Sequence, residues 1–279
     1  MYLLPRPQEM LLQDNVFYVD YTAEICIDPE ASPEWLHYAS LLQKEIEQDT
    51  GFHLNINRNL PVFQTPSILL KSTSGHSQQE YTLRIRESGI LLTASSNSGM
   101  LYAIQTLRQI IRQEGACLPG LDIHDFPVIS NRGLYYDVTR GRIPTLSYLK
   151  KMADTLSFYK INQLHLYIEH TYMFRNLSEV WRDDTPLTSS DILELDRYCA
   201  DLGIELVPSI ASFGHLYKIL RTKSFRHLCE REDLCEEPFG FIDRMEHHTI
   251  DVSNEESFSF IWSLIEEYLP LFRSDKFNI

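Results

Sequence analysis

Apolar and polar positions in the first part of the chain repeat with the periods of both strands and helices. Residues 16–27 alternate apolar and polar side chains, which predicts a strand. One helix is predicted to start with Ser32 as N-cap and Pro33 as first helical residue, and a second helix to follow Ser98. Further strands are predicted at residues 66–71, 80–86 and 90–94. Residues 1–120 are therefore expected to form an α+β domain, a sheet with helices on one side.

The pattern changes after residues 117–131, whose two prolines and one glycine are typical of a junction between domains. Strand-like and helical segments then alternate, at residues 133–138, 145–160, 163–168, 189–202, 204–208 and 254–269, and a last strand begins near residue 276. Thr188 with Asp191 is a predicted capping box. Ser253 with Glu256 is a second one. This α/β order predicts parallel strands, in an open doubly wound sheet or a (β/α)8 barrel.

The composition narrows the classes of partner. The chain carries 25 Lys and Arg against 39 Asp and Glu, so a nucleic acid partner is not expected, because phosphate binding needs a basic face. The five cysteines are odd in number and scattered, which argues against a disulfide framework. The N-terminus does not resemble a signal peptide, and no apolar stretch approaches the ~18 residues of a membrane span. We therefore expect a cytoplasmic protein with no membrane partner.

Five segments of the chain carry motifs that occur together in one enzyme family. They are YTLRIRESGILLTASSNSGMLYAIQTLRQII at 81–111, RGLYYDVTR at 132–140, KINQLHLYIEH at 160–170, GIELVPSIASFGH at 203–215 and the segment 249–279. In this order they resemble the small domain, the first three barrel strands and the helix before strand four of family-20 glycoside hydrolases, the β-N-acetylhexosaminidases. The resemblance implies a small α+β domain followed by a partial TIM-type (β/α)8 barrel, with residues 126–279 as the first half of the barrel.

The resemblance implies a hydrolase that removes a terminal β-linked N-acetylhexosamine with retention of configuration. In this family the acetamide of the sugar attacks the anomeric carbon, so the enzyme supplies no carboxylate nucleophile. One Glu protonates the leaving oxygen, and the Asp beside it orients the acetamide. The family places this Asp-Glu pair after the fourth strand, beyond Ile279, so these 279 residues alone are expected to be inactive.

Other interpretations fit the same residues. One is a non-catalytic carbohydrate-binding or regulatory half-barrel, and another is an unrelated open α/β protein. A half-barrel would expose an unpaired strand edge, so self-association through that edge is also expected. The choice between N-acetylglucosamine and N-acetylgalactosamine stays open.

Three strand ends carry the candidate site residues that the resemblance implies. Arg140 matches the arginine that hydrogen-bonds the hydroxyls of the terminal sugar. The alternative interpretation of Arg140 is that it only forms an ion pair on the surface. His215 matches the histidine that supports the catalytic acid through a hydrogen-bonded relay. Glu169 and His170 stand where the family usually has an Asp pair. Either of them is predicted to replace the Asp that contacts the histidine, the alternative being a hydrogen-bonded strand end.

The remaining candidates are assigned structural or minor roles. Arg132 is expected to be structural and Asp137 to organise the loop after the first barrel strand. Trp181 could touch a sugar ring. His247 and His248 are adjacent, but no ligand spacing such as HExxH occurs in the chain, so neither a metal nor another cofactor is expected.

Overall fold

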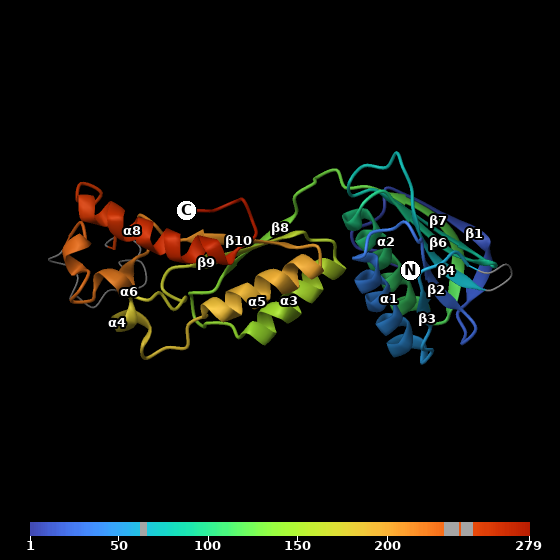
Figure 1. Cartoon of the computed structure of the whole chain (residues 1–279), viewed down its shortest axis with the longest axis horizontal. Helices are drawn as coiled ribbons and strands as arrows, with labels where there is room; N and C mark the ends of the chain where they lie inside the picture. Colours follow the sequence, from blue (N-terminus) through green and yellow to red (C-terminus); the bar gives the residue numbers. More distant parts are fainter. Residues whose placement is uncertain (62–65, 232–239, 241–247) are drawn as a thin grey trace. The chain divides into compact units, whose positions relative to one another are not determined.

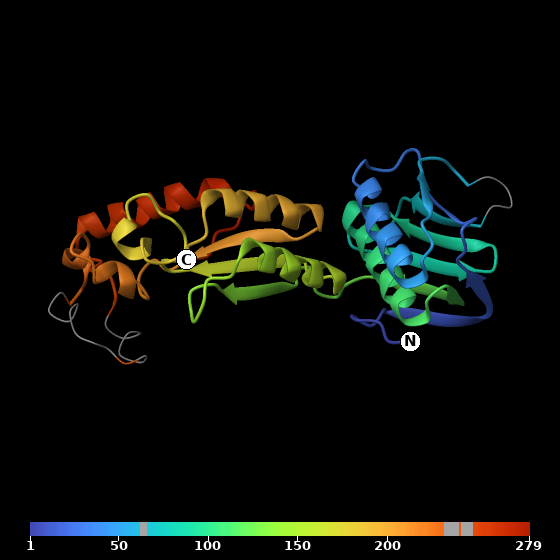
Figure 2. The same ribbon diagram turned by 90° about the horizontal axis from the view of Figure 1, so that it is seen from below.

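The computed structural model describes residues 1–61, 66–231, 240 and 248–279, which form two compact units (Figures 1 and 2). The first unit comprises Met1–Arg132 with Leu156–Lys160, and the second comprises Gly133–Thr155 with Ile161–Ile279. Cys235 and His247 lie outside the described residues. None of the helices described is both long and apolar enough to span a membrane.

The first unit contains a mixed seven-stranded sheet in the order β1-β7-β5-β6-β4-β2-β3. The strands are β1 Glu9–Tyr18, β2 Glu24–Ile27, β3 Asn55–Asn57, β4 Ser67–Ser72, β5 Tyr81–Arg86, β6 Gly89–Ala94 and β7 Cys117–Asp125. The helices are α1 Trp35–Thr50 and α2 Asn97–Glu114. Alternate residues of β5 and β6 are buried, as expected for strands with one face against a core. The predicted α+β architecture of this part is therefore confirmed.

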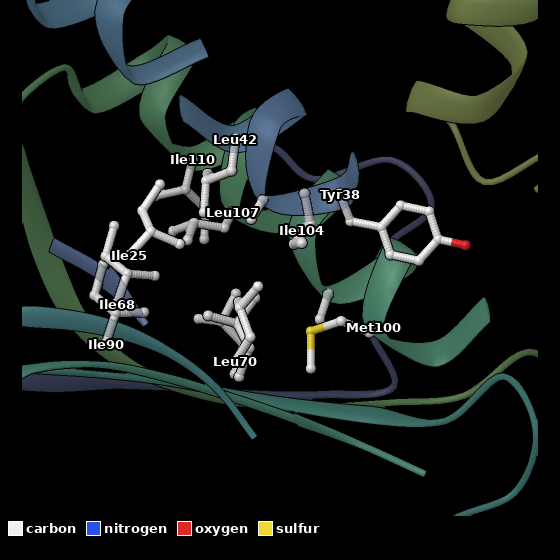
Figure 3. Close-up of a cluster of buried hydrophobic side chains, with 14 of the residues drawn as sticks. Ile25, Tyr38, Leu42, Ile68, Leu70, Ile90, Met100, Ile104, Leu107 and Ile110 are labelled. Carbon is white, nitrogen blue, oxygen red and sulfur yellow. The ribbon is translucent and has the colours of Figure 1, made fainter. Parts of the chain in front are cut away.

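The core of the first unit lies between the two helices and one face of the sheet. Side chains of α1 and α2 meet those of β2, β4 and β6 in a largely apolar layer (Figure 3). Its members include Leu42, Ile68, Leu70, Ile104 and Leu107, all completely buried. Burying each such side chain stabilises the fold by about 1.5–3 kcal/mol relative to leaving it exposed.

Residues 117–125 are not a junction but strand β7, so that part of the prediction was wrong. β7 pairs antiparallel with β1 on one side and β5 on the other, and its apolar residues Leu118, Leu121 and Ile123 are buried. Gly120 allows a close approach of backbone, because a Cβ there would collide with Asn15. The glycine therefore reflects packing between two strands, whereas the sequence alone indicated a junction between domains.

Three local expectations in the first unit also need correction. The strand expected at 16–27 is interrupted by a turn, in which the Asp20 carboxylate accepts hydrogen bonds from Thr22. The N-cap of α1 is Glu34 and not Ser32, and no side chain caps this helix. Ser96, not Ser98, caps α2, and its hydroxyl accepts a 3.0 Å hydrogen bond from the backbone N–H of Gly99.

The second unit is built from parallel strands that alternate with helices. Strands β8 Gly133–Asp137, β9 Gln163–Ile168 and β10 Glu205–Ile210 form a parallel sheet in the order β10-β9-β8. The helices are α3 Leu146–Phe158, α4 Ser178–Trp181, α5 Ser189–Asp201, α6 Tyr217–Leu220 and α8 Glu255–Tyr268, with 3₁₀ turns at Arg226–Leu228 and Leu269–Leu271. Asn278 adds a parallel bridge beside Ser209, consistent with the strand expected near residue 276.

Helices α3 and α5 lie side by side (Figures 1 and 2), and polar contacts join them. The Tyr198 hydroxyl donates a 2.7 Å hydrogen bond to Asp154, and Lys150 forms an ion pair with Glu194. The capping box predicted for α5 is present, because the side chains of Thr188 and Asp191 each accept from the other's backbone N–H. The box predicted for α8 is absent, since Asn254 is its N-cap.

The N-cap of α8 can be tested with two neighbouring substitutions. The Asn254 side chain accepts a 3.0 Å hydrogen bond from the backbone N–H of Glu256, whereas the Ser253 hydroxyl donates to Asp251. Asn254→Ala is expected to lower the free energy of unfolding by about 1 kcal/mol, because a free N–H loses its partner. Ser253→Ala, the matched control, should cost less than about 0.5 kcal/mol in urea denaturation. Equal losses for the two variants would contradict this assignment.

Candidate functional site

The carboxyl ends of the three parallel strands in the second unit meet at one cavity. Arg140 follows β8, Glu169 and His170 follow β9, and His215 lies on the loop after β10. All four residues line a cavity of about 450 Å³. Its other lining residues are Thr139, Gly141, Arg142, Ile143, Thr171, Asp184, Tyr217 and Lys218. The predicted strand ends are thus brought together, as expected at the carboxyl edge of a parallel sheet.

Arg140 is held in place by two carboxylates. Its guanidinium forms an ion pair with Asp137 and a second one with Glu169, at 2.8 Å between Nη2 and Oε1. Asp137 also accepts hydrogen bonds from the backbone N–H groups of Thr139 (2.8 Å) and Arg140 (3.2 Å). Burial alone would raise the pKa of Asp137, but these bonds outweigh it and the pKa is lowered. Asp137 therefore fixes the turn after β8 and keeps Arg140 directed at the cavity.

Glu169 is a buried carboxylate with several polar partners. Tyr167 donates a 3.1 Å hydrogen bond to Oε1, the oxygen that also contacts Arg140. The backbone N–H of Glu169 donates to the Thr139 hydroxyl at 3.1 Å, which joins the ends of β8 and β9. Burial raises the pKa of Glu169, while Arg140, Tyr167 and His215 act in the opposite direction. Glu169 and His215 both line the cavity.

His170 has a different environment from Glu169. Its side chain is 12% exposed, and Nδ1 lies 3.9 Å from Oε2 of Glu169. Burial, with a further contribution from the charge of Lys218, lowers the pKa of His170 to about 4. His170 is therefore neutral near pH 7. Lys218 itself forms a 2.6 Å ion pair with Asp184 at the border of the cavity.

His215 is held in a backbone conformation that non-glycine residues rarely adopt. Its φ angle is +62°, in the left-handed region. Such a conformation costs on the order of 1 kcal/mol or more and tends to persist at functional positions. The strain and the location in the cavity together single out His215 among the described histidines.

Two of the residues considered from the sequence lie outside the cavity. Arg132 belongs to the first unit, where it donates 2.9 Å hydrogen bonds to the carbonyl of Lys160 and the hydroxyl of Tyr102. Trp181 donates its indole N–H to the carbonyl of Phe174 at 2.8 Å and does not line the cavity. In the described part of the chain, no group of three or more His, Cys, Asp or Glu side chains could hold a metal ion.

Loops bring residues to the cavity that no motif or periodic segment of the sequence indicates. Asp184 and Lys218 are 34 positions apart, and neither belongs to a periodic segment or a motif. Arg142 follows Arg140 by two residues and lies over the ring of Tyr148, at 5.0 Å from its centre. The pattern of apolar positions carries no signal for such contacts, because long connections are placed by tertiary packing.

Known proteins resemble this chain over its full length. Residues 1–126 match the family described as glycosyl hydrolase family 20, domain 2, and residues 130–279 match its catalytic domain. A β-hexosaminidase of Porphyromonas gingivalis is 24% identical over 99% of this chain and 38% of its own length. One from Akkermansia muciniphila is 28% identical over 70% of this chain and 39% of its own length. The chain thus spans well under half of the length of these two relatives.

Solved structures support the same fold. The β-N-acetylhexosaminidase of Streptomyces coelicolor superposes with a TM-score of 0.84 at 21% identity, over 98% of this chain and 58% of that one. That of Streptomyces plicatus gives 0.85 at 20% identity, over 99% and 58%. The second unit is accordingly part of a TIM-type barrel, preceded by a small α+β domain. Since the catalytic-domain match alone covers more than half of the chain, the chain belongs to glycosyl hydrolase family 20.

Proposed function

We propose that the cavity binds the terminal N-acetylhexosamine of a β-linked glycan, in a protein that removes this sugar by substrate-assisted, retaining hydrolysis. The observation that carries the proposal is the meeting of Arg140, Glu169 and His215 in one cavity at the strand ends. A β-hexosaminidase of Streptomyces plicatus, 20% identical to this chain, has been solved with the product N-acetylglucosamine. That complex supports a sugar of the same class here.

Arg140 is suited to bind the hydroxyls of the sugar. Its guanidinium has five N–H donors in a rigid plane, and two carboxylates fix its orientation before a ligand arrives. Side chains that are held in place lose little freedom on binding, so more of the interaction energy appears as affinity. The proposed role of Arg140 is therefore recognition, with no part in bond breaking.

We assign the relay with His215 to Glu169 and not to His170. Glu169 lines the same cavity as His215 and carries the carboxylate that such a relay needs, whereas the low pKa of His170 keeps that ring neutral near pH 7. A carboxylate at this position raises the pKa of an acid nearby. Glu169 is thus a positioning residue. The acid itself is expected beyond these 279 residues, which would then bind the sugar without hydrolysing it.

The sugar-binding role of Arg140 can be measured on the chain as it stands. N-acetylglucosamine is expected to bind more tightly than glucose in an NMR titration, and no turnover of an aryl N-acetylglucosaminide is expected. Arg140→Met should weaken binding about 10- to 100-fold, since a hydrogen bond to a charged group contributes about 1.5–3 kcal/mol. Arg175→Met, which alters an exposed arginine outside the cavity, is the control. Unchanged affinity in Arg140→Met, or measurable turnover, would contradict the proposal.

The relay can be tested in a longer protein that includes the catalytic acid. Glu169→Gln is expected to lower kcat for an aryl N-acetylglucosaminide by about 100-fold. The alkaline limb of the kcat profile should move to lower pH, because removing a nearby negative charge lowers the pKa of the acid. His170→Gln, at the same strand end, should stay within about threefold of wild type. A loss of turnover confined to His170→Gln, or unchanged turnover in both variants, would show that Glu169 is not part of the relay.

We further propose that the chain self-associates through the edge of its parallel sheet. In the described residues β8 pairs only with β9, and Tyr135 on β8 is 52% exposed. An unpaired edge strand readily pairs with another chain. Sedimentation should therefore depend on concentration, and Tyr135→Lys should weaken association while Tyr21→Lys, in the first unit, should not. A monomer at all concentrations would refute this proposal.

A further inference from the structure

A cavity of about 250 Å³ lies within the first unit, and we call it the Lys160 cavity. One part of its wall is polar and is formed by Tyr81, Asp125 and Lys160. Another part is apolar and includes Phe126 and Val128, which follow strand β7. Sites for small molecules commonly combine an apolar wall with a few polar groups. The Lys160 cavity has this composition, and it shares no residue with the candidate sugar cavity.

The ammonium group of Lys160 is buried, and one of its N–H groups has no acceptor among the described residues. The side chain is 6% exposed, and Nζ donates hydrogen bonds to the Tyr81 hydroxyl at 2.9 Å and to Oδ2 of Asp125 at 3.1 Å. An ammonium has three N–H donors, and a buried donor without an acceptor costs free energy. Tyr81 and Asp125 also line the cavity, so the ammonium lies at its wall. An oxygen atom of a ligand can accept the third hydrogen bond there.

The charges around the cavity favour an anion. In the described part of the chain its lining contains Arg6, Arg132 and Lys160 but a single carboxylate, that of Asp125. Arg6 is exposed and has no ion-pair partner among the described residues. Burial lowers the pKa of Lys160 although Asp125 acts in the opposite direction, so a further anion would stabilise the ammonium. A concave surface with an excess of positive charge also concentrates anions.

The size and the side chains of the cavity favour a ligand with one aromatic ring. Its apolar and aromatic lining residues include Tyr81, Tyr102, Phe126, Val128 and Ile129. Val128 and Ile129 are largely exposed, so the cavity is open to solvent on their side. Aromatic rings pack against one another in edge-to-face and offset-stacked contacts. Since a cavity of about 150 Å³ can hold benzene, about 250 Å³ leaves room for a ring with a small substituent.

We propose that the Lys160 cavity binds a small aromatic carboxylate. The ring packs against Phe126 and Val128, and the carboxylate accepts the remaining hydrogen bond of the Lys160 ammonium, with Arg6 as a second positive charge. A hydrogen bond from an ammonium to a carboxylate is stronger than one to a neutral oxygen. This site lies within the first unit and does not depend on the proposed hydrolysis of sugars by the second.

Three probes titrated into the chain by NMR separate the contributions of the charge and the ring. Phenylacetate is expected to bind with a dissociation constant between about 10 µM and 1 mM. Phenylacetamide, which has the same shape but no charge, should bind at least about 10-fold more weakly, and so should acetate, which has no ring. The resonances that shift should belong to residues lining the Lys160 cavity. Absence of phenylacetate binding, equal affinity for phenylacetamide, or shifts centred elsewhere would overturn the proposal.

An exposed position at the cavity gives a variant that leaves the core intact. Lys160→Met would leave the buried Asp125 carboxylate without its cation, so the first unit could unfold. Val128→Asp changes a side chain that is 83% exposed and places a negative charge beside the ligand, which should weaken phenylacetate binding at least about 10-fold. Val252→Asp makes the same change at a 74% exposed position in the second unit and should bind phenylacetate like wild type. Unchanged affinity in Val128→Asp, or an equal loss in both variants, would refute the site.

Discussion

The ion pair between Arg140 and Glu169 joins the ends of two neighbouring parallel strands and fixes the positions of both side chains in the cavity. Glu169 is buried, so its charge requires a partner inside the protein, and Arg140 supplies it at 2.8 Å. Asp137 holds the other side of the same guanidinium and the turn that carries it. The two strand ends are thereby fixed to each other through charge as well as through the backbone pairing of β8 and β9.

The surroundings of Glu169 and His170 give these two neighbouring residues different chemical properties. Glu169 and His170 are adjacent in the chain, but the neighbouring charge with the largest effect on the pKa is different for each. Glu169 lies beside Arg140, while His170 lies in a buried place where Lys218 further disfavours its protonation. Sequence comparison with the family left both open as replacements for the same Asp. The distinction depends on the burial of His170 and on Lys218, which is 48 residues away in the chain. The sequence of the strand that precedes Glu169 and His170 indicates neither.

Much of the fold followed from the periods of apolar residues, because βα units place successive strand ends at one edge. The strand ends that precede Arg140, Glu169 and His215 were predictable for that reason, whereas the choice of these three residues came from the motifs that resemble the family. The starts of α2 and α8 were not predictable, because Ser96 and Ser98, or Ser253 and Asn254, are equally good caps, and the path of the preceding chain decides between them. Strand β7 was missed because its glycine and proline are typical of a junction between domains, and only the flanking strands β1 and β5 show that these residues pack in a sheet.

The left-handed backbone conformation of His215 lowers the stability of the loop, and the same residue places an imidazole in the cavity. Glycine adopts this conformation without steric penalty, so a glycine there would relax the loop after β10. It would also remove the imidazole from the cavity. Variants selected only for thermal resistance would therefore tend to lose this histidine, whereas selection for the proposed function of the cavity would retain it and accept a loop less stable than it could be.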